Sequence, residues 1–134
     1  MAVPTVRRLD AGDEAVIVRL AEREPQTALL ADERTLFVVA FDGDTPVGFA
    51  FGYLLPRCHG DAEMLFVYEV DVDAGYRRQG TPTRLLRELE RLARDRGVRE
   101  AFVLADADND PAARLYASIG GEPIDVVQWE LRYP

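Results

Sequence analysis

The chain has 134 residues, which suits one domain and leaves no room for a second. Its net charge is -8, which argues against nucleic acid as a partner, because a nucleic-acid-binding face needs basic residues that neutralise phosphates. No apolar run is long enough to cross a bilayer, and no apolar stretch follows Arg7 and Arg8 as it would in a secretory signal. We therefore expect one cytoplasmic domain, residues 1–134, without membrane or nucleic-acid partners.

The N-terminal half of the sequence consists mainly of strand-like runs separated by turn signals. Residues 13–24 carry apolar side chains at helical spacing, and Pro25 ends that pattern. Two runs of β-branched and aromatic residues flank Asp42-Gly43-Asp44, a turn signal that predicts a hairpin. The predicted elements are a strand over 5–9, a helix over 13–24, and strands over 35–41, 47–55 and 64–72.

In the C-terminal half, helical patterns alternate with strands. Apolar residues from Thr83 onward fall at helical spacing as far as Gly97, where a helix stop is expected. The other predicted elements are a buried strand over 101–105, a short helix over 110–119 and a final strand over 126–131. Strands that first meander and then alternate with helices predict an α/β fold, with a mixed, mostly antiparallel sheet flanked by helices.

Cys58 and His59 are neighbours in a polar loop, and such a pair raises the question of a metal site. A metal site normally needs three or four ligands at recognisable spacing, and the sequence contains no such set. We therefore expect no metal. A disulfide within the chain is impossible, because Cys58 is its one cysteine.

The stretch from Val70 to Thr83 is the most informative part of the sequence. A strand runs into a glycine-containing loop, and the loop opens a helix. Helix N-termini carry unpaired N–H groups and a partial positive charge, and therefore bind phosphates. Gly80 permits a close approach of the backbone, and Arg77 and Arg78 add positive charge. The pattern predicts a pyrophosphate cradle, with a plain charged turn before a helix as the alternative.

This stretch resembles the acyl-CoA motif of the GNAT superfamily of N-acetyltransferases. That motif is Arg or Gln, two residues, Gly, one residue, then Gly or Ala, and Arg77, Gly80 and Pro82 occupy its places. Pro82 departs from the motif and has no N–H to donate, so the hydroxyl of Thr81 or Thr83 would replace one contact. The resemblance implies acetyl-CoA as co-substrate. The residues implied to bind it here are Val70, Val72, Arg77, Arg78, Gln79, Gly80, Thr81 and Thr83.

A second block, residues 109–120, resembles the next GNAT block, in which an Asn precedes a short helix that bears Leu-Tyr and ends in Gly-Phe. Gly121 replaces that Phe here. The resemblance implies that Asn109 touches the cofactor arm and that Tyr116 protonates the departing thiolate. The alternative for Tyr116 is a core aromatic on an amphipathic helix.

An amine substrate is protonated at neutral pH, so a base must take its proton before it attacks a thioester. Side chains alternate along a strand, so Glu69 and Asp71 share one face of the predicted strand. The residues that would share the other face are Tyr68, Val70 and Val72. We predict Glu69 as catalytic base and substrate ligand, with Asp71 and Asp110 as further substrate-binding carboxylates. The alternatives are a solvated strand face and, for Asp110, a helix N-terminal charge.

Within the superfamily, the sequence is most similar to aminoglycoside 3-N-acetyltransferases of the GNAT type. The residues that carry this likeness are Tyr68-Glu69-Val70, Arg77-Arg78-Gln79-Gly80, Asp110-Pro111-Ala112 and Leu115-Tyr116. It implies transfer of an acetyl group from acetyl-CoA to a primary amine of a polycationic small molecule such as an aminoglycoside, and hence antibiotic resistance. The net charge of -8 agrees, because it attracts cations.

Two alternatives stay open from the sequence. The acceptor can be another amine, namely a polyamine, an amino acid or a protein N-terminus, or the chain can be a non-catalytic acyl-CoA-binding domain. A free sheet edge would also allow a homodimer.

Overall fold

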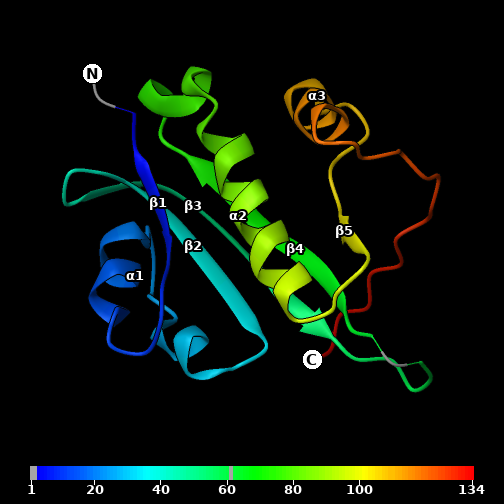
Figure 1. Ribbon diagram of the computed structural model, residues 1–134. Helices are drawn as coiled ribbons and strands as arrows, with labels where there is room; N and C mark the ends of the chain where they lie inside the picture. The colour runs from blue at the N-terminus through cyan, green and yellow to red at the C-terminus, as the bar shows by residue number, and fades with distance from the viewer. Residues whose placement is uncertain (1–2, 61) are drawn as a thin grey trace. The chain divides into compact units, whose positions relative to one another are not determined.

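The computed structural model describes residues 3–60 and 62–134. Its sheet has the strand order β1-β2-β3-β4-β5, in which β1 to β4 are antiparallel neighbours and β5 is parallel to β4 (Figure 1). The strands are β1 (Thr5–Arg8), β2 (Thr35–Asp42), β3 (Thr45–Leu55), β4 (Met64–Val72) and β5 (Ala101–Val103). The predicted α/β fold with a mixed, mostly antiparallel sheet is confirmed.

The described residues also form three α-helices and two 3₁₀-helices. They are α1 (Glu14–Leu20), η1 (Thr27–Ala31), η2 (Ala74–Gln79), α2 (Thr81–Asp95) and α3 (Asp110–Ser118). Helix α1 is shorter than predicted, because the backbone at Ala21 is already extended. The sequence did not predict η1 or η2, since a 3₁₀-helix of five or six residues is too short to show a periodic pattern.

Strand β2 lies at the centre of the core and is buried on both faces. Phe37 belongs, with Ile17 of α1, to an apolar cluster on one face. Leu36 and Val38 point to the other face, where α2 crosses β2 and β3 (Figure 1). Apolar residues at consecutive positions are therefore required in this strand, and its sequence supplies them.

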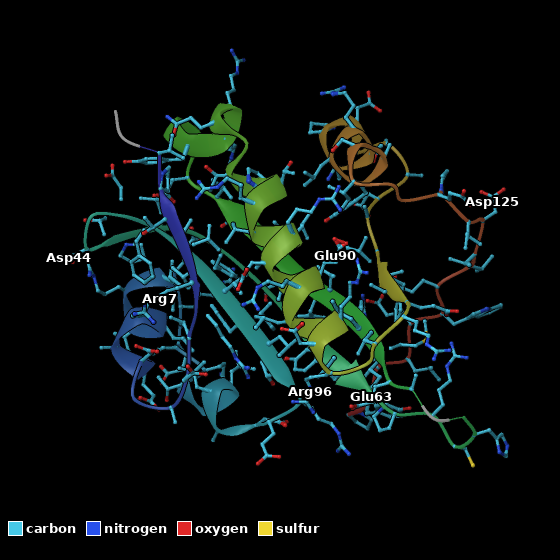
Figure 2. All side chains as sticks on the ribbon, in the orientation of Figure 1. Arg7, Asp44, Glu63, Glu90, Arg96 and Asp125 are labelled. Atoms are coloured by element: carbon cyan, nitrogen blue, oxygen red, sulfur yellow. The ribbon has the colours of Figure 1, made fainter. Side chains whose placement is uncertain are left out.

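Polar contacts join the C-terminal end of α2 to the residues that precede β2 and β4. Arg96 Nη2 lies 3.8 Å from Glu63 Oε1, and Arg96 Nη1 donates a hydrogen bond of 3.1 Å to the carbonyl of Glu33 (Figure 2). Glu63 Oε2 lies 3.6 Å from Nε of Arg34. Exposed ion pairs contribute only about 0–1 kcal/mol, so these contacts orient the chain between elements more than they stabilise the fold.

The chain forms two compact units, the first ending at Leu104 and the second running from Ala105 to Pro134. In the second unit, Asn109 Oδ1 accepts a hydrogen bond of 3.1 Å from the N–H of Ala112 and caps α3. The N–H of Gly121 returns to the carbonyl of Tyr116 at 2.8 Å and closes the other end. A Cβ at Gly121 would lie 2.8 Å from that oxygen, so glycine permits this tight closure.

Two predicted strands differ from the structure. The strand expected to be buried over 101–105 is the short β5, and its Phe102 is 38% exposed, because β5 is the last strand of the sheet. The final strand predicted over 126–131 is wrong, since those residues form no strand. Apolar alternation does not make a strand unless a neighbouring backbone pairs with it. The large apolar side chains of this segment are exposed, Trp129 at 84%.

Candidate functional site

Strand β4 contains a bulge where the predicted substrate residues lie. The register with β3 pairs Phe51 with Glu69 but Gly52 with Val67, so Tyr68 is the extra residue. A Cβ at Gly52 would lie 2.5 Å from the carbonyl oxygen of Phe66. Only glycine lets the two strands approach this closely at the bulge.

The bulge corrects the predicted alternation along β4. Tyr68 was expected to share a face with Val70 and Val72, opposite Glu69. An extra residue shifts the alternation by one, so Tyr68 and Glu69 both line the same pocket, whereas Val72 is buried.

We expect Gly52→Ala to disturb this bulge. The added methyl must displace backbone rather than a flexible side chain, so the free energy of unfolding should fall by about 1–3 kcal/mol. Gly75→Ala is a matched control, because its new Cβ meets no atom within 4 Å. Chemical denaturation of both variants measures the difference, and equal stabilities would show that the β3–β4 approach is not tight.

The pairing of β4 with β5 ends at the bulge. Their parallel ladder pairs Leu65 with Ala101 and ends at Val67 and Val103. From Tyr68 to Val72 the edge of β4 on that side therefore has no ladder partner among the described residues. Backbone N–H and C=O groups along such an edge can hydrogen-bond a ligand that carries amides of its own.

The loop after β4 leads directly into α2 and has the geometry of an anion site. Gly80 has a φ of +72°, a left-handed conformation that favours glycine. Among the described residues no side chain caps α2, so its first N–H groups are left for a ligand. Thr81 is fully buried, and neither its Oγ1 nor the buried Nη1 of Arg84 has a hydrogen-bond partner in the part of the chain that the structure describes. These unpaired donors at a helix N-terminus suit a phosphate.

Two side chains hold this loop against the sheet. Arg77 Nε donates a hydrogen bond of 2.7 Å to the carbonyl of Val72, the last residue of β4. The hydroxyl of Tyr76 donates one of 2.5 Å to Asp42 Oδ2 at the end of β2, and this bond raises the pKa of Tyr76. Arg77 thus positions the loop, and the neighbouring Arg78 is exposed.

A pocket of about 500 Å³ lies in the first unit between the sheet and the segment from α1 to β2. One wall is aromatic, and Phe37 stacks on Phe51 there with ring centroids 5.1 Å apart. The other aromatic side chains of the wall are Phe49, Tyr53 and Tyr68. No arginine is among the described residues that line the pocket.

Three carboxylates among the described residues line this pocket, and only one of them was predicted from the sequence. Glu69 is the predicted one, and Glu24 and Asp32 join it from the segment between α1 and β2. Asp71 is exposed and does not line the pocket, although its partner Phe49 does. A pocket with acidic and aromatic walls suits a cationic ligand, because carboxylates and aromatic faces both attract positive charge.

The remaining predicted residues belong to the second unit. Tyr116 lies on α3 and is half-buried, and burial raises the pKa of its phenol. The side chain of Asn109 caps α3, as described above. Asp110 is the first residue of α3 and is exposed, which agrees with a helix N-terminal charge.

Two further observations concern the whole described chain. Within residues 3–60 and 62–134, no three His, Cys, Asp or Glu side chains are grouped so that they could hold a metal ion. No described helix is both long enough and apolar enough to cross a membrane.

Comparison with known families identifies the class of protein. The sequence profile of the acetyltransferase (GNAT) family matches residues 6–120, which is most of the chain. The chain therefore belongs to the acetyltransferase (GNAT) family. No curated protein matches it.

Several solved structures have the same fold at low sequence identity. An aminoglycoside acetyltransferase from an uncultured soil metagenomic sample, in complex with trehalose, is 22% identical with a TM-score of 0.89, over 98% of this chain and 97% of that one. The enzyme AAC(6')-Iy, in complex with the bisubstrate analogue CoA-S-monomethyl-acetylneamine, is 16% identical with a TM-score of 0.81, over 99% and 100% of the two chains. A ribosomal-protein-alanine N-acetyltransferase from Brucella melitensis is 20% identical with a TM-score of 0.77, over 97% and 99%.

Proposed function

We propose that this protein transfers an acetyl group from acetyl-CoA to a primary amine of a polycationic small molecule, such as an aminoglycoside. The observation that carries the proposal is the position of Glu69. It lines a pocket that is suited to cations, and it lies on the same strand whose free edge continues into the anion-binding loop. Strand β4 therefore links the candidate amine-binding pocket to the loop that would bind a phosphate-bearing acyl donor.

The free edge of β4 and the loop after it suit acetyl-CoA as the acyl donor. The free edge of β4, from Tyr68 to Val72, would bind the amide-bearing pantetheine arm of acetyl-CoA, and the N–H groups of Gly80, Thr81 and Thr83 would bind its pyrophosphate. Pro82 falls in the first turn of α2, where its missing N–H costs little. The unpaired Oγ1 of Thr81 is a further donor there.

The thioester supplies an activated acetyl group, and the chain's own residues handle the protons. Glu69 would take a proton from the substrate ammonium so that the nitrogen can form the new C–N bond. N–H groups on the free edge of β4, near Val72, would hold the negative charge that develops on the acetyl oxygen. Tyr116 would give its proton to the sulfur as the C–S bond breaks. The acetylated nitrogen then loses its second proton, which restores the phenol of Tyr116.

Solved structures with this fold include enzymes that act on polycationic small molecules. One of the aminoglycoside acetyltransferases with this fold was solved in complex with sisomicin, at 22% identity to this chain. The ribosomal-protein-alanine acetyltransferase shows that the same fold also serves a protein substrate. The acidic pocket favours the polycationic small molecule for this chain.

Acetyl-CoA should raise the melting temperature of the protein, because a ligand that binds only the folded state stabilises it by mass action. At about one hundred times the dissociation constant, the gain is about 2.7 kcal/mol, which corresponds to several degrees for a chain of this size. Free CoA shares the pyrophosphate and should also stabilise, whereas a short acetyl thioester without the nucleotide should not. No shift at millimolar acetyl-CoA would contradict the proposed donor.

A further inference from the structure

Thr35 lines the pocket that also contains Glu69, called the acceptor pocket from here on. The residue is 5% exposed, and its Oγ1 has no hydrogen-bond partner among the described residues. Thr35 begins β2 and lines the pocket, and it points to the same face as Phe37, two residues further on. An unpaired buried hydroxyl is unfavourable, so one in a pocket wall is a place where a ligand can supply the missing bond.

Asp32 lies beside Thr35 and brings a negative charge to the same part of the pocket. Its Oδ1 accepts a hydrogen bond of 2.9 Å from the N–H of Arg34, and its carbonyl accepts one of 3.0 Å from the N–H of Thr35. These bonds fix the turn before β2. No arginine among the described residues forms an ion pair with Asp32, so its charge is available to a ligand.

Tyr53 lies between this acidic turn and Glu69. It is paired with Thr35 across β2 and β3, and it lines the pocket. Burial raises the pKa of Tyr53, and the neighbouring Tyr68, Glu69 and Asp32 raise it further. The carboxylates of Glu69 and Asp32 therefore both contribute to the raised pKa of the Tyr53 phenol.

The sheet sets the separation of the two acidic groups. Glu69 is on β4, Asp32 precedes β2, and β3 runs between these strands. Neighbouring strands are about 4.8 Å apart, so β2 and β4 are about 10 Å apart across the sheet. The register places Glu69 level with Phe51 and Phe37, whereas Asp32 lies further along, beyond the pair of Thr35 and Tyr53. Both carboxylates line the same pocket, so one ligand can contact both, and Phe37 and Phe51 form an apolar wall beside Glu69.

We propose that Asp32 and Thr35 form a second ammonium subsite, so that the pocket selects amines that carry a second ammonium group several ångströms from the acetylated one. This inference rests on the proposed acetyl transfer at Glu69. An ammonium group has three N–H donors, and the carboxylate of Asp32, the hydroxyl of Thr35 and the phenol oxygen of Tyr53 are acceptors for them. The carbon skeleton between the two nitrogens lies against the aromatic wall.

The test compares diamines with monoamines of the same length, namely putrescine with butylamine and cadaverine with pentylamine. The wild type should prefer each diamine in kcat/KM by about tenfold or more, and Asp32→Asn should remove most of that preference, because kcat/KM falls much more for the diamine than for the monoamine. Asn at this position can still accept the hydrogen bond of Arg34. The chain has no lysine, so amine-reactive detection reports the substrate with little background.

A matched control separates the subsite from general attraction of cations. Asp44 lies in the β2–β3 turn (Figure 2), does not line the pocket, and its replacement by Asn removes the same charge. If Asp44→Asn lowers the diamine preference as much as Asp32→Asn does, the preference comes from long-range steering and the proposed subsite is wrong. Equal kcat/KM for a diamine and its monoamine in the wild type would also overturn it.

Thr35→Val provides a test with two opposite readouts. The substitution keeps the shape of the side chain and removes an unpaired buried hydroxyl, so the melting temperature should rise or stay level. The affinity for putrescine should fall, because the second ammonium loses an acceptor. Unchanged putrescine affinity would remove Thr35 from the subsite.

Direct binding distinguishes failure of the subsite from failure of the proposed enzyme activity. Calorimetric titration of putrescine into the wild type and Asp32→Asn, without acetyl-CoA, measures the subsite alone. Weaker binding to the variant supports the subsite even if no amine is acetylated, in which case the proposed transferase activity is what fails. Equal binding to both proteins overturns the subsite whether or not acetylation occurs.

Discussion

Replacing Glu69 by Gln should lower kcat/KM for an aminoglycoside by about 10²–10⁴-fold, the range expected when a general base is lost. Gln keeps the size of the side chain and can still hydrogen-bond, but it cannot take a proton at neutral pH. The bulge at Tyr68 directs Glu69 into the pocket. The kinetic constants for the amine should therefore change, whereas the binding of the acyl donor should not. Steady-state kinetics with each substrate varied in turn measures this division.

The same variant separates a shaped pocket from general electrostatic attraction. Attraction by the net charge of -8 weakens as salt rises, whereas close carboxylate–ammonium hydrogen bonds are less sensitive to it. The comparison is kcat/KM for an aminoglycoside, spermidine and a lysine-rich peptide, at low and high salt, in the wild type and in Glu69→Gln. If the peptide is the best substrate, or if Glu69→Gln changes nothing, the aminoglycoside-like acceptor is wrong.

Tyr116→Phe should lower kcat by about 10²-fold or more while the dissociation constant of acetyl-CoA stays nearly unchanged. The hydroxyl would act on the charge of the departing thiolate, which forms only in the transition state. Burial raises the pKa of Tyr116, so the phenol holds its proton throughout the neutral pH range, as an acid must. Tyr133→Phe is the control, because Tyr133 is 84% exposed near the C-terminus.

The structure also defines how a negative result for Tyr116 would be interpreted. Tyr116 is half-buried on α3, and its carbonyl accepts the N–H of Gly121, a contact of the backbone that the variant retains. If Tyr116→Phe turns over at the wild-type rate and keeps its melting temperature, the phenol has no chemical role. Tyr116 is then a packing residue, and another group protonates the sulfur.

Local sequence patterns predicted most of the sheet and the main helix. Strand β4 has the predicted bounds of 64–72, and α2 begins only two residues before Thr83. Helix α2 is long and strongly periodic, and its apolar residues match the face that the fold buries. The bounds of β4 follow from its run of apolar and β-branched residues, although the bulge shifts its alternation. The final strand over 126–131 failed because pairing depends on a distant backbone, about which a local apolar pattern gives no information.

The candidate site was predictable only where its residues are consecutive. The loop from Arg77 to Thr83 forms a motif, so a candidate anion site there could be predicted from its spacing. The bulge depends on Gly52 of a neighbouring strand, and the pocket brings Asp32 and Thr35 to Glu69 from far along the sequence. No pattern in the sequence joins these residues, and only the packing of the strands reveals their proximity.

The most direct test of the account is product analysis after incubation of the protein with acetyl-CoA and an aminoglycoside. The account predicts that the aminoglycoside gains the mass of one acetyl group, at an amine, and that one free CoA thiol appears for each acetyl group transferred. Glu69→Gln should form far less product under the same conditions. If the wild type binds acetyl-CoA but acetylates none of an aminoglycoside, spermidine, an amino acid or a peptide N-terminus, the proposed acetyltransferase activity is contradicted.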